Sequence, residues 1–166
     1  MGKTIRRLVL LVSLVMAVGI PRAWADSPHF LYADATILAN TGSLQVAFKE
    51  AGLGLTALDE TVTLRVGFAA AEYQCFNGGG KHPSANNKQT VATSLTLVQR
   101  FPVSNGETTG RFVTGPVPRG AFSCPNGQDL YLVNVTYARM TVTGSAGDTL
   151  AVRPDPIAAS LKILVA

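Results

Sequence analysis

Residues 61–68 read TVTLRVGF, and this stretch decides the fold class. Apolar residues occupy every second position, at Val62, Leu64, Val66 and Phe68, and polar or small residues stand between them. Successive side chains of a β-strand point to opposite faces, so the pattern predicts a strand with one buried face.

The same alternation recurs on both sides of this stretch. It covers residues 31–39, 44–49, 90–103, 110–117 and 130–142. The apolar positions change parity within 130–142, and again between Phe68 and Cys75, so we expect a β-bulge in 130–142 and another in 69–73. No window of helical length carries a comparable apolar stripe with caps.

The turns between these stretches complete the prediction of the fold. Asn105-Gly106 stands between two predicted strands and indicates a hairpin, because both residues tolerate positive φ. Pro125-Asn126-Gly127 indicates another tight turn. About seven short strands predict an antiparallel, immunoglobulin-like β-sandwich, with a closed β-barrel as the alternative.

The N-terminus has the pattern of a secretory signal peptide. A basic start with Arg6 and Arg7 precedes an apolar run over 8–18, and the small-residue pattern Ala23-Trp24-Ala25 follows. We expect cleavage after Ala25, which makes 1–25 the signal peptide and 26–166 a single secreted, extracellular domain without membrane attachment.

Cleavage removes the apparent basic character of the chain. The 14 Lys and Arg exceed the 10 Asp and Glu, but Lys3, Arg6, Arg7 and Arg22 lie in the signal peptide, and every acidic residue follows it. The secreted part is therefore balanced in charge. It has no basic cluster, so nucleic acid is not an expected partner.

The chain has two cysteines, Cys75 and Cys124. In an exported protein the simplest use of two cysteines is one disulfide, and a reactive thiol is the alternative. Closing this segment predicts about 4 kcal/mol of stabilisation in the chain-entropy treatment.

The stretch CFNGGGKHPS, residues 75–84, gathers residue types that catalysis and ligand binding often use. Its glycines are not followed by a helix, as a phosphate-binding loop requires. Neither His82 nor His29 has a metal ligand at a recognised spacing, so no metal or cofactor is expected. A secreted hydrolase built around His82 is the enzymatic alternative, although no nucleophile motif accompanies it.

A binding role is favoured over an enzyme. We expect Cys75 to end a strand and a long loop over 76–89 to emerge beside the turn at 125–127, because the disulfide joins their bases. The candidate binding residues are Phe76, Lys81, His82, Asn86, Asn87 and Lys88. A tolerated surface insertion is the alternative.

The expected partner is an extracellular protein or a glycan, and the function a binding or structural module. Surface aromatics can stack on sugars, which makes a carbohydrate-binding module an alternative. The available rings are Tyr73, Phe76, Tyr131 and Tyr137, and core packing is the competing explanation for them.

Two stretches carry a resemblance, YQCFNGGG at 73–80 and FSCPNGQDL at 122–130. They resemble a group of small secreted bacterial proteins of uncharacterised function, in which a signal peptide precedes a β-rich domain with two cysteines. The resemblance implies a β-sandwich with a Cys75–Cys124 bridge, and it implies no activity or ligand.

Overall fold

A computed structural model describes residues 27–78 and 83–165. These residues form eight β-strands and no helix. The strands are β1 (His29–Leu38), β2 (Ser43–Ala51), β3 (Asp59–Asn77), β4 (Pro83–Pro102), β5 (Glu107–Thr114), β6 (Gln128–Thr143), β7 (Thr149–Ala151) and β8 (Ile157–Leu164). The predicted signal peptide lies outside the described residues.

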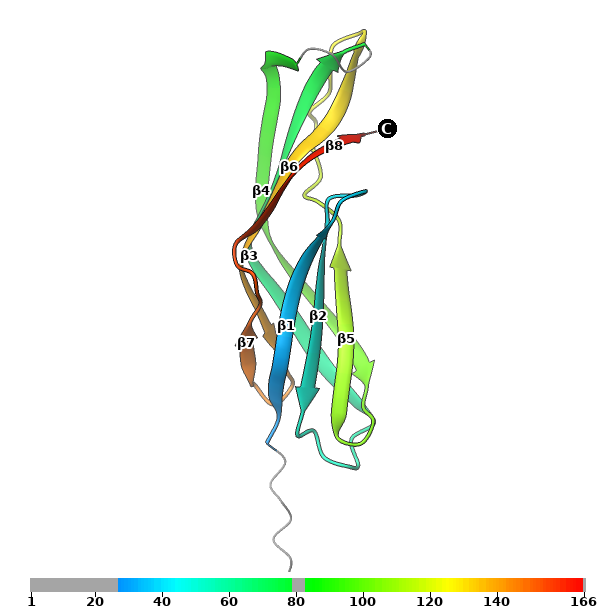
Figure 1. Ribbon diagram of the computed structural model, residues 1–166, viewed down its shortest axis with the longest axis vertical. Helices are drawn as coiled ribbons and strands as arrows, with labels where there is room; N and C mark the ends of the chain where they lie inside the picture. The colour runs from blue at the N-terminus through cyan, green and yellow to red at the C-terminus, as the bar shows by residue number, and fades with distance from the viewer. Residues whose placement is uncertain (1–26, 79–82, 166) are drawn as a thin grey trace, which may run out of the picture.

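The strands form two antiparallel sheets packed face to face (Figure 1). One sheet has the order β1-β2-β5. The other has the order β4-β3-β6, and both β7 and β8 pair with the far edge of β6 at different heights. The two sheets do not close into a barrel. The predicted β-sandwich is therefore confirmed, with one strand more than the seven expected.

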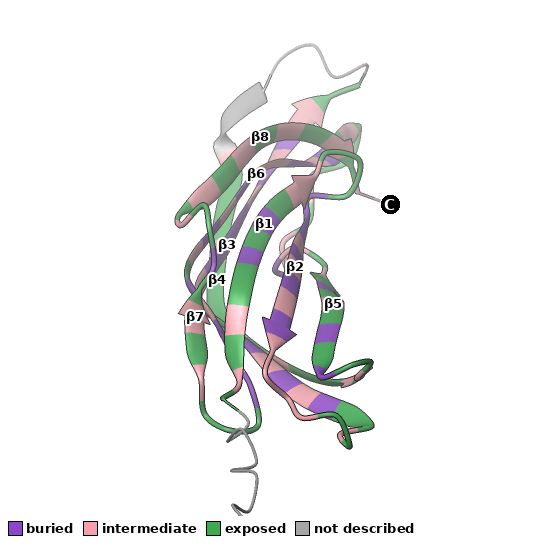
Figure 2. Cartoon of the chain, turned by 60° about the horizontal axis from the view of Figure 1, so that its bottom comes forward, coloured by how far each residue is buried: buried purple, intermediate pink, exposed green. Residues whose placement is uncertain are grey.

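The alternation read from the sequence builds the core. In β2 the inward positions are Leu44, Val46 and Phe48, all fully buried, and in β3 they begin with Val62 and Leu64. Figure 2 shows the resulting stripes of buried and exposed residues along the strands. Burial of these apolar faces is the main stabilising contribution to the fold.

The bulge predicted in 130–142 is confirmed. Val133 is an extra residue in β6, because Glu72 pairs with Asn134 while Tyr73 pairs with Leu132. A second irregularity follows at Arg139, whose φ is 55°. The carboxylate of Asp155 accepts hydrogen bonds from the main-chain N–H groups of Arg139 and Met140, at 2.8 and 2.9 Å.

The bulge predicted in 69–73 lies slightly earlier on β3. The register with β4 shifts between Val66 and Ala69, so the inward positions pass from Val66 to Ala69, Ala71 and Tyr73. Phe68, which the alternation placed in the core, is therefore only partly buried, and the Arg139 guanidinium lies 6.0 Å from its ring centroid.

The hairpin predicted at Asn105-Gly106 is half correct. Both residues have positive φ, 54° and 74°, and Ser104 and Glu107 exchange two main-chain hydrogen bonds. Beyond this turn the strands separate, because β4 pairs with β3 and β5 pairs with β2 in the opposite sheet. The tight turn is a local property, whereas the partner of each strand is set by the sandwich.

The five-stranded sheet is longer than its partner and extends beyond it (Figure 1). Its extended half consists of the end of β3, the beginnings of β4 and β6, and β8. The segment 115–127 covers the inner face there, where Val117 is buried and its carbonyl accepts a 2.7 Å hydrogen bond from the Tyr73 hydroxyl. The outer face of this half remains uncovered by any described segment.

Candidate binding site

The disulfide links the extended half of the five-stranded sheet to the segment 115–127. Cys75 on β3 and Cys124 in the 115–127 segment are bonded, with their α-carbons 5.6 Å apart, as predicted. Gln128 donates its main-chain N–H to the Pro125 carbonyl, which closes the expected turn directly after the bridge.

The long loop predicted over 76–89 is wrong. Phe76 and Asn77 continue β3 and pair with Asp129 and Gln128 of β6, while β4 already begins at Pro83. Asparagine has low strand propensity, but β6 gives the main chain of Asn77 hydrogen-bond partners.

The six candidate residues are consequently divided. Phe76 lies near the end of β3, and Asn86, Asn87 and Lys88 lie in β4. Lys81 and His82 are outside the described residues, so the hydrolase built around His82 stays an untested prediction. The side chain of Asn87 donates a 2.8 Å hydrogen bond to Gln128, which in turn donates to Asn77 at 3.0 Å.

The four candidate rings fall into two pairs. Tyr73 and Tyr137 are buried, at 4 and 0 % exposure, and belong to the core. Phe76 and Tyr131 lie on the outer face, in an edge-to-face pair with centroids 5.1 Å apart. The Lys162 ammonium on β8 lies 4.9 and 5.5 Å from the two ring centroids.

Next to this ring pair, a row of polar side chains crosses the four strands of the extended half, β4, β3, β6 and β8. The Lys88 ammonium is 2.7 Å from Glu72 Oε1, the Asn134 amide donates to the same oxygen at 3.3 Å, and Ser160 Oγ donates to Asn134 Oδ1 at 2.9 Å. A carboxylate only accepts hydrogen bonds, so Glu72 fixes the orientation of the amide.

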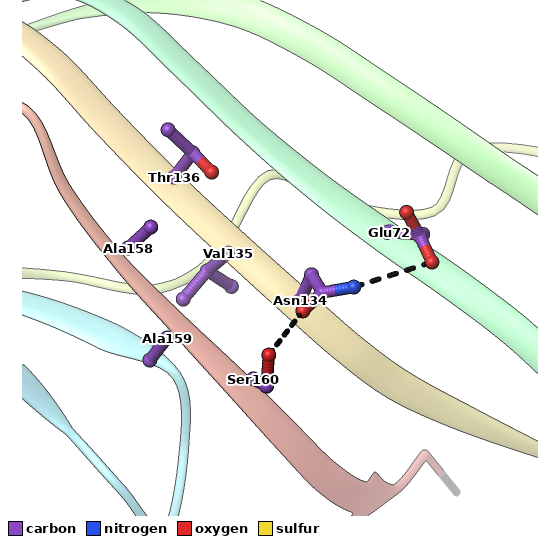
Figure 3. A pocket seen from close by; sticks show the side chains of 7 residues that line it. All are labelled: Glu72, Asn134, Val135, Thr136, Ala158, Ala159 and Ser160. Atoms are coloured by element: carbon purple, nitrogen blue, oxygen red, sulfur yellow. Dashed lines mark hydrogen bonds between the residues drawn. The ribbon is translucent and has the colours of Figure 1, made fainter.

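An open hollow of about 340 Å³ lies along this row (Figure 3). Its lining residues are Glu72, Asn134, Val135, Thr136, Ala158, Ala159 and Ser160, from β3, β6 and β8. The small side chain of Ala158, on the exposed side of β8, leaves space above the sheet, while Glu72, Asn134 and Ser160 supply polar atoms at its floor. Ala159 and Val135 point to the core side, so these two residues border the hollow from the opposite face of the sheet. Sequence reasoning missed this hollow because its three strands are far apart along the chain.

The same face therefore combines two aromatic rings, a cation and a set of amide, hydroxyl and carboxylate groups. Such a surface can contact an apolar ring face and exchange hydrogen bonds with hydroxyl groups beside it.

The described residues contain no helix that is long and apolar enough to cross a membrane.

The chain matches no family model, no curated protein and no solved structure. The function must therefore be argued from the site itself.

Proposed function

We propose that this protein is a secreted β-sandwich binding module that binds a glycan through the outer face of its disulfide-bonded end. The observation that carries the proposal is the ring pair Phe76–Tyr131 beside the polar row that ends at Asn134 and Ser160. The position of this face on strands, rather than on a loop, supports a preformed site.

The chemistry of the face fits a sugar better than an apolar ligand. A sugar ring has an apolar C–H face and a rim of hydroxyl groups that both donate and accept hydrogen bonds. The rings of Phe76 and Tyr131 suit the former, and the amide, hydroxyl and carboxylate of the polar row suit the latter. An open hollow also accepts an extended chain, whereas a small apolar ligand usually needs an enclosed pocket.

The test is binding of the exported protein to a panel of neutral and acidic polysaccharides by affinity electrophoresis. We expect retardation by at least one polysaccharide, and a loss of about tenfold or more in affinity for Tyr131→Ala, which corresponds to about 1.4 kcal/mol. Tyr32→Ala is the matched control, because Tyr32 is 40 % exposed on β1, in the opposite sheet.

Two results would contradict the proposal. One is the absence of retardation by every polysaccharide at millimolar sugar concentrations. The other is retardation that Tyr32→Ala and Tyr131→Ala reduce equally, because binding would then not depend on the outer face of the extended half.

A further inference from the structure

Three acidic residues meet at the end of the sandwich opposite the disulfide. Glu50 lies near the end of β2, Glu60 near the beginning of β3, and Asp148 directly before β7. The alternation that places Phe48 and Val62 inside the sandwich also places Glu50 and Glu60 inside, at 0 and 5 % exposure. Two carboxylates thus occupy inward positions that an apolar residue would ordinarily fill.

Two of these carboxylates lack hydrogen-bond donors. Both side-chain oxygens of Glu50 and both of Asp148 are buried without a partner among the described residues. Glu60 differs, because its oxygens accept hydrogen bonds from the main-chain N–H and the hydroxyl of Ser145, at 2.5 and 2.9 Å. Leaving polar oxygens buried and unsatisfied is costly, so this arrangement favours a partner that contacts both groups.

Gly144 shows that the two carboxylates converge on one place. A Cβ at this position would lie 2.6 Å from Glu50 Oε1 and 2.6 Å from Asp148 Oδ1, closer than side chains approach one another. Glycine leaves room for both oxygens above the start of the turn that links β6 to β7, whereas a Cβ would force at least one of them to move.

Among residues 27–78 and 83–165, the charges that act on Glu50 are those of two other carboxylates and of no cation. Burial, the charges of Asp148 and Glu60, and a side-chain hydrogen bond that Glu50 can make to Asp148 when protonated raise the pKa of Glu50 to about 8. The adjacent Lys49 points to the other face of β2 and pairs with Glu107 at 2.8 Å.

We propose that Glu50 and Asp148 bind a calcium ion at this end of the sandwich. A shared proton would create one hydrogen bond and leave most of the four buried oxygens without a partner, whereas a cation can contact oxygens of both groups. An all-oxygen donor set suits a hard cation. Among the described residues, no group of three or more His, Cys, Asp or Glu side chains is placed to hold a metal ion by itself. The remaining ligands are therefore main-chain carbonyls and water, which Ca²⁺ accepts in its flexible shell of six to eight oxygens.

The experiment is chemical unfolding of the exported protein at pH 7, after EDTA treatment and dialysis, with and without 10 mM CaCl₂. For an affinity typical of extracellular calcium modules, with Kd of about 10⁻⁴–10⁻³ M, we expect the unfolding equilibrium constant to fall about 10- to 100-fold on adding Ca²⁺. Glu50→Gln and Asp148→Asn should remove this response, and Glu107→Gln, at an exposed ion pair, should keep it. Asp148→Asn provides the readout if Glu50→Gln does not fold, because Asp148 lies on a surface turn.

Three outcomes would overturn the proposal. One is an unfolding constant that does not change with Ca²⁺. Another is a response that both variants retain, because it would come from another site or from ionic strength. The third is a wild type that gains stability between pH 7 and pH 5 but ignores Ca²⁺, which would mean that a proton neutralises the pair.

Discussion

Gly110 shows how a single absent side chain shapes the core. It lies on β5 opposite Phe48, and a Cβ there would stand 2.5 Å from atoms of both the Phe48 and the Phe101 ring. Those rings meet edge to face with centroids 4.9 Å apart, and Phe112 packs against both. The glycine is therefore required by packing and not by backbone conformation.

Gly110→Ala should destabilise the protein by about 1–3 kcal/mol, because the added methyl group forces the aromatic cluster apart. Gly115→Ala is the matched control, since nothing lies within 4 Å of its added Cβ. Urea unfolding of both variants measures the difference. Equal stabilities would show that the rings adjust without cost.

Tyr137 should give the protein a pH-dependent stability in alkaline solution. Burial, together with the neighbouring Tyr73, raises its pKa to about 12, and its hydroxyl donates a 2.9 Å hydrogen bond to the Gly42 carbonyl. Because the folded pKa exceeds the unfolded value near 10, the stabilisation is complete below pH 10 and is lost as pH rises towards 12.

Tyr137→Phe tests this dependence. At pH 9 the variant should be about 1 kcal/mol less stable than the wild type, because the Gly42 carbonyl loses its donor. At pH 11.5 the order should reverse, since only the wild type must keep the Tyr137 phenol protonated in the core, whereas Tyr73 is present in both proteins. Urea unfolding at the two pH values gives both differences, and a constant difference would contradict the assignment.

At the scale of elements, the disulfide holds a segment without regular strand structure against a long sheet. The segment 115–127 has few main-chain hydrogen bonds of its own, and its contacts with the sheet depend on Val117, Phe122 and Cys124. Cys75 and Cys124 are 49 residues apart, so the bridge restricts much of the unfolded chain.

Replacing Cys75 and Cys124 together by alanine should lower the free energy of unfolding by about 4 kcal/mol, from lost restriction of the unfolded chain. Guanidinium unfolding of the variant and of the oxidised wild type measures this loss. Adding a reductant should lower the free energy of unfolding of the wild type towards that of the variant, and should leave that of the variant unchanged. A loss below about 1 kcal/mol would mean that the unfolded chain is already restricted there.

At the scale of the whole molecule, the two ends carry different chemistry. The disulfide-bonded end presents rings and a polar row on an uncovered sheet face, while the opposite end encloses unsatisfied carboxylates. The sandwich between them is a conventional apolar core. The proposed glycan site and the proposed cation site lie at different ends and can therefore be tested independently.

The exported protein should begin at Asp26. The reason is the Ala23-Trp24-Ala25 pattern after the apolar run, and Trp24 is the only tryptophan in the chain. Intact mass of the secreted form should match residues 26–166, and its emission spectrum should lack tryptophan fluorescence. A mass that retains Trp24 would place the cleavage site elsewhere.

The sequence alone determined the features that depend on neighbouring residues. Period-two alternation over 61–68 identified β3 and the inward-facing Val62 and Leu64, and Asn105-Gly106 identified a tight turn. The disulfide followed from having two cysteines in a chain whose N-terminal pattern predicts export. Each of these features depends on local side-chain direction, backbone preference or covalent chemistry.

The tertiary structure decided which strands became neighbours, and with them the candidate sites. The partner of β5, the continuation of β3 through Asn77, and the row from Lys88 to Ser160 all depend on pairings between distant segments. The approach of Glu50 to Asp148 likewise needs the two sheets to close on each other. Alternation shows which side of a strand faces inward, but packing of the two sheets decides what that side meets there.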